Sequence, residues 1–155
     1  MSEVASILPP PQDQDPLRRA LDCLREGFQV IGFDWTYVYL NPAAARHGRR
    51  AAGDLIGKPI TEAYPGIERT PVFALMRECM ERRTSHVLEN EFPFPDGTAH
   101  WFEVRIQPVP EGICVYSADI DARKRRQLAA EHGGGWFAAF VHRLFSLFER
   151  RRAAG

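Results

Sequence analysis

The fold is decided by residues 85–124, which read SHVLENEFPFPDGTAHWFEVRIQPVPEGICVYSADIDARK. This stretch contains three runs of strand length, rich in β-branched and aromatic side chains. They are separated by Pro95-Asp96-Gly97 and by Pro110-Glu111-Gly112. Because Asp-Gly between two alternating runs is a strong hairpin signal, we predict consecutive antiparallel strands here.

The middle run has an apolar face and a polar face. Apolar and polar side chains alternate along it: Phe102, Val104 and Ile106 against Glu103, Arg105 and Gln107. A strand with this pattern covers a core on one side and meets water, at least in part, on the other.

The preceding residues predict helices and two further strands. Asp15-Pro16 is a helix start, and Leu17, Leu21 and Leu24 mark one face of a flanking helix over 15–27, closed by Gly27. Two short strand-type runs, 28–33 and 37–40, form a second hairpin.

Helical segments then follow up to residue 83. Asn41-Pro42 starts a short helix, 53–66 contains short helical turns, and Thr70-Pro71 begins the longest central helix. Strands and helices are thus segregated along the chain. We predict an α+β domain over 28–126, with a five-stranded antiparallel sheet and helices on one face.

Charge and cysteine content narrow the class of protein. The net charge is zero, which gives no case for nucleic-acid binding, but residues from 122 onward carry eight Arg or Lys against two Glu. Three widely spaced cysteines, Cys23, Cys79 and Cys114, indicate buried thiols rather than a metal site. We see no signal peptide or transmembrane run and expect a cytoplasmic protein, with 1–14 disordered.

Five motifs occur in a fixed order between the first and last strands. They are Asn41-Pro42-Ala43, Asp54-Leu55-Ile56-Gly57-Lys58, Asp96-Gly97 followed by Trp101, Pro108-Val109, and Asp119-Ile120-Asp121-Ala122-Arg123-Lys124. Together with the element order, they resemble a PAS domain, the sensory module of bacterial and eukaryotic signalling proteins, over 17–126. The family usually has Asp-Ile-Thr-Glu-Arg-Lys at the last motif, so this chain departs at two positions.

The resemblance implies a signal exit at the end of the last strand. Its residues are Asp119, Ile120, Asp121, Arg123 and Lys124, and plain capping of the strand is the alternative role. We expect Asp119 to accept hydrogen bonds or to pair with Arg123 or Lys124.

The resemblance also raises the question of a cofactor. Haem-binding PAS domains use a His on the central helix, and flavin-binding light sensors use an Asn-Cys-Arg-Phe-Leu type of run; the sequence has neither. We predict no cofactor and leave open an unknown small-molecule ligand, with a filled core as the alternative. Candidate pocket residues are Phe73, Met76, Cys79, Met80 and Trp101.

No motif for catalysis or metal binding is present. The sequence lacks a nucleophile elbow, a phosphate loop, a paired-carboxylate motif and a metal signature, so we predict a non-catalytic protein. The buried setting expected for Cys79 predicts a raised thiol pKa.

The C-terminal part contains a linker over 127–135 and an amphipathic helix over 136–152. Large apolar side chains fall on one half of that helix, among them Trp136, Phe137, Phe140, Leu144 and Phe148. This face would be buried against its own sheet or a second copy, in a membrane surface, or in the groove of a partner. Gly133-Gly134-Gly135 is also typical of a joint between separately acquired or engineered pieces.

The sequence therefore predicts a sensory or interaction module, dimeric through its flanking helices. It would bind a small molecule or a protein and signal in trans to another protein. The alternative is a peripheral membrane or partner-docking adaptor in which the C-terminal helix is the functional element.

Overall fold

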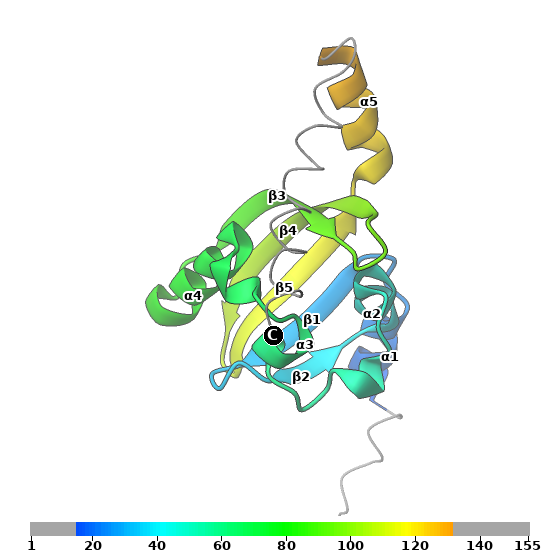
Figure 1. Ribbon diagram of the computed structural model, residues 1–155. Helices are drawn as coiled ribbons and strands as arrows, with labels where there is room; N and C mark the ends of the chain where they lie inside the picture. Colours follow the sequence, from blue (N-terminus) through cyan, green and yellow to red (C-terminus); the bar gives the residue numbers. More distant parts are fainter. Residues whose placement is uncertain (1–14, 132–155) are drawn as a thin grey trace, which may run out of the picture. The chain divides into compact units, whose positions relative to one another are not determined.

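The computed structural model describes residues 15–131 (Figure 1). The strands are β1 (Gly27–Gly32), β2 (Tyr37–Leu40), β3 (His86–Pro93), β4 (Ala99–Val109) and β5 (Gly112–Asp119). The helices are α1 (Pro16–Asp22), α2 (Pro42–Gly48), α3 (Ile60–Ala63), α4 (Pro71–Arg82) and α5 (Asp121–Glu131), with short 3-10 turns η2 (Ala52–Asp54) and η3 (Ile67–Arg69).

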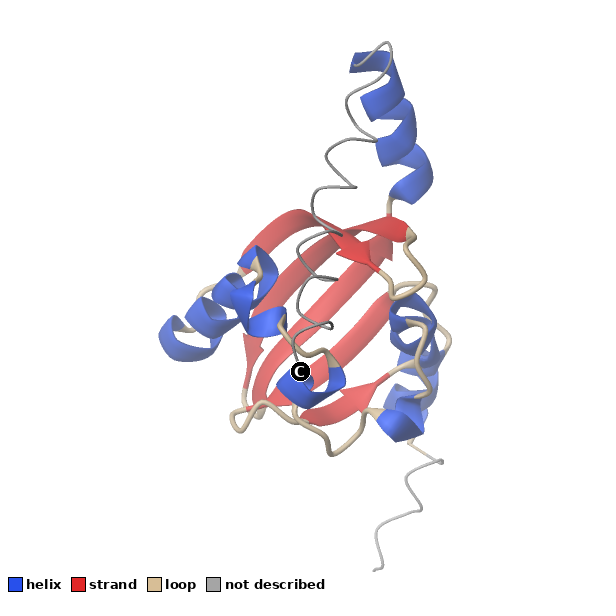
Figure 2. Ribbon diagram, viewed as in Figure 1, coloured by secondary structure: helices blue, strands red, loops and turns tan. Residues whose placement is uncertain are grey.

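The strands form one sheet in the spatial order β2-β1-β5-β4-β3, and β1 is antiparallel to both of its neighbours. Helices α2, α3 and α4 lie on one face of this sheet (Figure 2). The predicted α+β fold with a five-stranded antiparallel sheet is confirmed. None of the helices between residues 15 and 131 is long and apolar enough to cross a membrane.

The described part of the chain divides into two compact units. Within the described residues, one contains 15–88 and 104–118, and the other contains 89–103 and 119–131. The buried stripe of α4 belongs to the first unit, and the predicted signal exit belongs to the second. Each is therefore described by itself.

The N-terminal corner of the first unit is built around Asn41. Its Oδ1 accepts hydrogen bonds from the backbone N–H groups of Phe28 and Ala44, both at 2.9 Å. Its Nδ2 donates to the carbonyl oxygens of Leu21 (2.9 Å) and Glu26 (3.0 Å). The predicted cap of the helix at Pro42 is confirmed, and the same amide also holds the chain on both sides of Gly27.

Helix α1 is shorter than predicted. Asp15 caps it as expected, accepting from Leu17 N at 3.0 Å, but the helix ends at Asp22 instead of continuing to 27. Gly27 begins β1 and pairs with Ser117 instead of closing the helix. The physical reason is tertiary, because Asn41 binds the backbone at Glu26 and Phe28 and holds it extended.

Gly27 is also required for close packing. A Cβ at this position would lie 2.3 Å from Ser117 Oγ and 2.9 Å from His47 Nδ1. Those two atoms are 3.0 Å apart and form a hydrogen bond between α2 and β5. A larger residue at 27 would therefore displace this pair.

The hairpin between β3 and β4 follows the Asp-Gly prediction. Asp96 Oδ1 accepts from the backbone N–H of Thr98 at 2.9 Å and from its hydroxyl at 2.6 Å. Gly97 has φ 85°, in the left-handed region that favours glycine. The turn is thus held by its own short side chains.

The cysteines differ in their surroundings. Cys79 and Cys114 are buried, as predicted, but Cys23 is exposed, so the prediction of three buried thiols is wrong for this residue. Cys23 is the C-cap of α1, a helix whose own residues are all at least partly exposed. An apolar pattern on so short a helix did not lead to burial.

Helix α5 extends into the segment predicted to be a linker. It runs to Glu131, so the expectation of a linker over 127–135 is wrong for residues 127–131. Gln, Leu, Ala and Glu favour helix, and the glycines that predicted the break lie at 133–135, outside the described residues. The predicted tail over 1–14 and helix over 136–152 lie outside the described residues.

Candidate functional site

Helix α4 carries a buried apolar stripe. Thr70 caps the helix through its hydroxyl, which accepts from Phe73 N at 3.3 Å, and Pro71 occupies the first turn. Residues at helical spacing then fall on one face. Four of the five predicted pocket residues are buried along it: Phe73, Met76, Cys79 and Met80.

Trp35 is a contact of this stripe that the sequence did not reveal. Its ring lies 4.7 Å from the ring of Phe73, centroid to centroid, and its backbone has φ 66° in the β1–β2 turn. Its carbonyl oxygen accepts a hydrogen bond from Ile60 N. A tight turn thus places an aromatic ring against the first turn of α4, and the turn motif around Asp34-Trp35-Thr36 was the available signal.

The thiol of Cys79 belongs to the buried apolar stripe of α4. Burial raises the pKa of Cys79, although the nearby Arg83 guanidinium opposes the shift. Burial also raises the pKa of the Cys114 thiol. Neutral thiols are weak nucleophiles, so both behave as small apolar side chains at neutral pH.

The fifth predicted pocket residue, Trp101, contacts the exit segment. The Lys124 ammonium lies 5.0 Å from the centre of its ring. Its carbonyl oxygen accepts from Ile120 N at 3.0 Å, and its N–H donates to Asp121 Oδ1 at 3.2 Å. Its role as a ligand contact stays a prediction, whereas its backbone clearly holds the start of α5.

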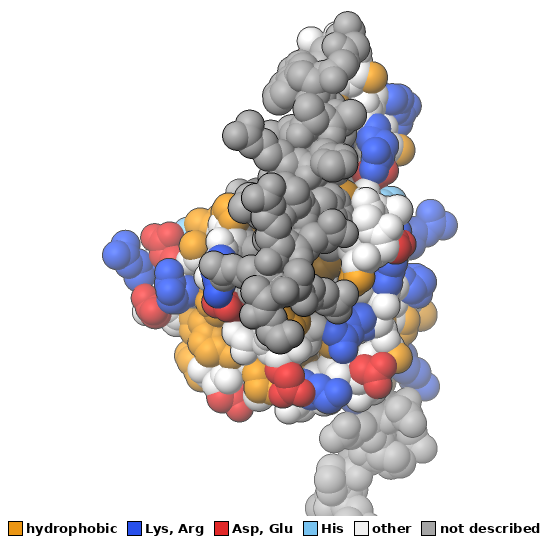
Figure 3. Space-filling model, viewed as in Figure 1, with side chains coloured by type: hydrophobic (Ala, Val, Ile, Leu, Met, Phe, Trp, Pro, Cys, Tyr) orange, Lys and Arg blue, Asp and Glu red, His pale blue; other side chains and the backbone are white. Residues whose placement is uncertain are grey.

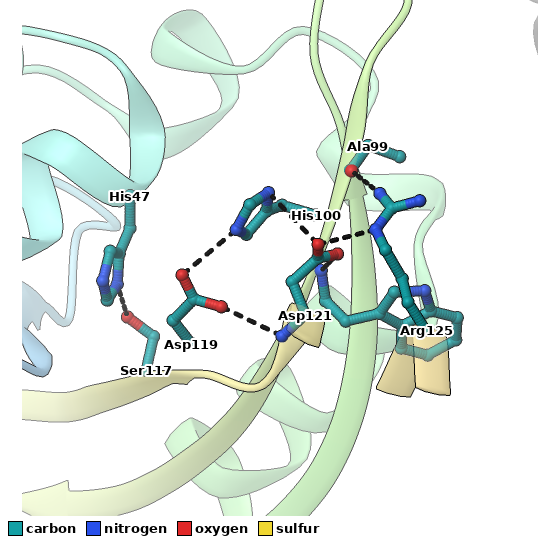
Figure 4. Close-up of polar contacts among 8 residues, drawn as sticks. His47, Ala99, His100, Ser117, Asp119, Asp121 and Arg125 are labelled. Carbon is teal, nitrogen blue, oxygen red and sulfur yellow. Dashed lines mark hydrogen bonds and ion pairs between the residues drawn. The ribbon is translucent and has the colours of Figure 1, made fainter. Parts of the chain in front are cut away.

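Asp119 and Asp121 organise the junction between β5 and α5. Asp119 Oδ1 accepts from the backbone N–H of Asp121 at 2.9 Å. Asp121 Oδ2 accepts from Arg125 Nε at 2.6 Å, and Arg125 Nη2 donates to the Ala99 carbonyl oxygen at 2.8 Å. Figure 4 shows these contacts at the end of β5.

Arg123 and Lys124 pair with a residue that the sequence did not single out. Glu89 Oε1 lies 2.9 Å from Arg123 Nη2, and Glu89 Oε2 lies 2.6 Å from Lys124 Nζ. Of the two alternatives expected for Asp119, accepting hydrogen bonds is confirmed, whereas the ion pair with Arg123 or Lys124 is made by Glu89 instead. Asp119 instead faces His100, because its second oxygen lies 3.1 Å from His100 Nε2.

The ion pairs shift the acidity of their carboxylates. The hydrogen bond from Lys124, joined by that from Arg123, lowers the pKa of Glu89 against a smaller desolvation effect. Burial acts to raise the pKa of Asp121, but hydrogen bonds from Arg125 and from Trp101 N outweigh it and lower the pKa. Both groups are thus carboxylates at neutral pH.

The outer surface of α5 is basic. Arg123, Arg125 and Arg126 are exposed, and Figure 3 shows Lys and Arg side chains along this helix. Within residues 15–131 there is no group of three or more His, Cys, Asp or Glu side chains that could hold a metal ion.

A comparison with protein families decides the classification. The model of the PAS fold matches residues 21–125, which include all five strands and the exit junction. The chain belongs to the PAS family.

Solved structures with the PAS fold resemble this domain at low sequence identity. The LOV protein of Rhodobacter sphaeroides has a TM-score of 0.59 and 14% identity, over 74% of this chain and 70% of that one. An RNA-binding light-oxygen-voltage receptor has a TM-score of 0.60 and 23% identity, over 84% of this chain and 40% of that one. The structure of VqmA bound to DPO has a TM-score of 0.56 and 21% identity, over 65% of this chain and 55% of that one. No curated protein matches the chain.

The PAS domain thus has two groups of candidate functional residues. The α4 stripe contains four of the predicted pocket residues, to which the structure adds Trp35. The exit contains the five predicted residues, to which it adds Glu89, His100 and Arg125. Glu89 and His100 are distant in sequence from the exit motif, and Arg125 follows the motif, so local sequence patterns did not reveal them.

Proposed function

We propose that this PAS domain is a non-catalytic sensory or interaction module that signals through the junction between β5 and α5. The observation that carries the proposal is the continuity of β5 with α5 through Asp119 and Asp121. Asp119 binds the N–H of Asp121 at that junction, and Asp121 binds the N–H of Trp101 on β4, so a shift of the last residues of β5 would be transmitted to the first turn of the helix.

We further propose that a small apolar ligand binds against the α4 stripe, lined by Phe73, Met76, Cys79 and Met80. Apolar and sulfur-containing side chains of this kind suit a small, largely apolar molecule with few polar groups. The structure of VqmA, a similar fold, was determined with DPO bound, and this likeness supports the proposal of a ligand.

Nuclear magnetic resonance with indole, a small apolar heterocycle, tests the ligand proposal. We expect indole to shift the amide signals of Met76 and Cys79. The shifts should disappear in Met76→Trp, because the larger side chain occupies the space proposed for the ligand against the α4 stripe. The matched variant Ala74→Trp changes an exposed position on the same helix and should keep the response. Shifts scattered over the surface, or no shifts at millimolar indole, would contradict the ligand proposal. The binding of a protein would then remain as the proposed signal that the domain senses.

The flanking helix α1 supports a homodimer. Leu17 on α1 is 75% exposed, and Leu24, which follows the end of the helix, is 36% exposed. We propose that α1 pairs with a second copy. Light scattering after size-exclusion chromatography, at about 50 μM chain, should give a dimer for the full chain and a monomer for Leu17→Glu. A full chain that is monomeric at that concentration would contradict the dimer.

The second candidate function is a peripheral membrane or partner-docking adaptor. It rests on the sequence of residues 136–152, where large apolar side chains fall on one half of a helical projection. Co-sedimentation with anionic liposomes compares the full chain with one that ends at His132. Binding by the full chain alone supports the adaptor, and equal binding by both removes it.

A further inference from the structure

His100 lies between two carboxylates at the start of α5. Its Nε2 is 3.1 Å from Asp119 Oδ2, and its Nδ1 is 4.0 Å from Asp121 Oδ2. Figure 4 shows one ring nitrogen directed at each aspartate. The side chain of His100 is 34% exposed, so protons from solvent reach the ring.

The two carboxylates also hold the start of α5, because each accepts a hydrogen bond from a backbone N–H group. Asp119 Oδ1 holds the N–H of Asp121, and Asp121 Oδ1 holds the N–H of Trp101. The first turn of α5 also has a backbone hydrogen bond from Lys124 N to the Ile120 carbonyl oxygen, at 2.8 Å. Any change in what faces these carboxylates therefore acts on the first turn of α5.

The chemistry of the ring makes this arrangement sensitive to protons. A neutral imidazole has one N–H and one lone pair, whereas an imidazolium has two N–H donors. Ionised carboxylates only accept hydrogen bonds. Nε2 lies within hydrogen-bond distance of Asp119, whereas the 4.0 Å between Nδ1 and Asp121 is an ion-pair distance, so the attraction to Asp121 depends on the positive charge of the ring. Histidine is the side chain that ordinarily changes charge between about pH 5 and 8.

Other charged groups at the same junction contact Asp121 or each other, and none is described as a partner of Asp119. Arg125, on α5, already binds Asp121 Oδ2 at 2.6 Å. From β3, Glu91 adds a half-buried carboxyl whose pKa is raised by burial, with Arg125 opposing. From the same strand, Glu89 engages Arg123 and Lys124. Asp119 therefore has no described cationic partner besides His100 in residues 15–131.

We propose that His100 is a proton-dependent clasp on the first turn of α5. The imidazolium attracts both Asp119 and Asp121 and secures the helix start; loss of its proton removes the positive charge between them. The clasp makes pH a second input to the exit. It does not require a ligand against α4, so it stands or falls independently of the ligand proposal.

Hydrogen exchange at the Lys124 amide measures the clasp directly. Protection factors, corrected for the intrinsic pH dependence of exchange, are compared at about pH 5.5 and about pH 8, which bracket the ordinary titration of histidine. We expect protection to fall about two- to fivefold at the higher pH, the range that a partly exposed ion pair supplies. In His100→Gln, which stays neutral, protection should be the same at both pH values.

Three further variants keep the test decisive. His86→Gln removes a histidine whose Nε2 lies 3.8 Å from Glu78 on α4, and it should retain the full pH response. Glu91→Gln should retain it as well, which separates His100 from the half-buried glutamate. Asp119→Asn keeps the cap on Asp121 N and the histidine but removes the charge that faces Nε2, so the response should shrink even if His100→Gln fails to fold. Equal protection at both pH values in the unmodified chain, or an undiminished response in His100→Gln or Asp119→Asn, overturns the clasp.

Discussion

Asn41 shows how much one polar side chain organises when it is buried and fully hydrogen-bonded. Its exposure is 0%, and its side-chain oxygen and nitrogen make two hydrogen bonds each. These bonds join the end of α1, the start of β1 and the start of α2. The residue that caps α2 therefore also connects α1 and β1 to that helix through hydrogen bonds.

Replacing Asn41 by Ala should destabilise the domain by on the order of 2–4 kcal/mol, because four backbone groups lose their partner and several are buried. Denaturant unfolding measures the change. Asp15→Ala removes an exposed cap of α1 that holds one backbone N–H, and should cost at most about 1 kcal/mol. Similar losses in the two variants would show that the hydrogen bonds of Asn41 contribute nothing beyond helix capping.

Glu89 is the residue that determines where Arg123 and Lys124 bind. Its folded-state pKa is lowered, so it contributes stability above the ordinary pKa of glutamate, and that contribution is lost as pH falls through the folded pKa. We expect amides of α5 to lose protection on acidification below about pH 4.5.

The variant Glu89→Gln should reduce protection of α5 already at pH 7 and weaken its acid dependence, measured by hydrogen exchange. Glu81→Gln changes an exposed glutamate of the α4 segment and serves as the control. An acid response of α5 that is unchanged in Glu89→Gln would exclude this ion pair as its cause.

At the scale of elements, α4 is held at both ends by different means. Thr70 caps its start, whereas Arg83 follows its end in the left-handed region, with φ 58°. The Arg83 guanidinium donates to the carbonyl oxygens of Gly112 and Val109, at the turn between β4 and β5, and lies 5.3 Å from the ring centre of Phe33. One side chain thus joins a helix end to two β-turns.

Arg83→Ala should destabilise the domain by about 1–3 kcal/mol, because two carbonyl oxygens and an aromatic ring lose a charged partner. Arg83→Lys should recover only part of this loss, since an ammonium lacks the planar fork of the guanidinium. Arg82, whose side chain is 74% exposed, is the matched control, and Arg82→Ala should change stability by less than about 0.5 kcal/mol. Equal effects at 82 and 83 would contradict the joining role.

At the scale of the whole molecule, the three thiols report how the chain opens. Cys23 is exposed, whereas Cys79 in α4 and Cys114 in β5 are buried and their pKa values are raised by burial. Burial and low thiolate content both slow the reaction with disulfide reagents.

We expect one thiol to react rapidly with Ellman's reagent in the native state and the other two to react only as the domain unfolds. The rate for these two should rise with denaturant in step with loss of structure measured by circular dichroism. Cys23→Ser should abolish the rapid phase and leave the slow one unchanged. Rapid labelling of all three thiols without denaturant would contradict the observed burial.

Much of the fold was predictable because it rests on local rules. Asp96-Gly97 determines a tight turn, Pro after Asp15, Asn41 or Thr70 starts a helix, and alternation in β4 marks its buried face. The apolar stripe of α4 follows from helical spacing in the same way. These features depend on residues within a few positions of one another.

The sequence by itself thus determined the elements, the sheet and the PAS kinship, since turn, cap and periodicity signals act over short separations. Only the tertiary structure decided that Asn41 ends α1 early, that Trp35 lies on Phe73, and that Glu89 rather than Asp119 pairs with Arg123 and Lys124. It also decided that His100 stands between two carboxylates. Each of these contacts joins residues that are distant along the chain. Which of several charged or aromatic residues becomes the partner depends on the strand order of the folded sheet.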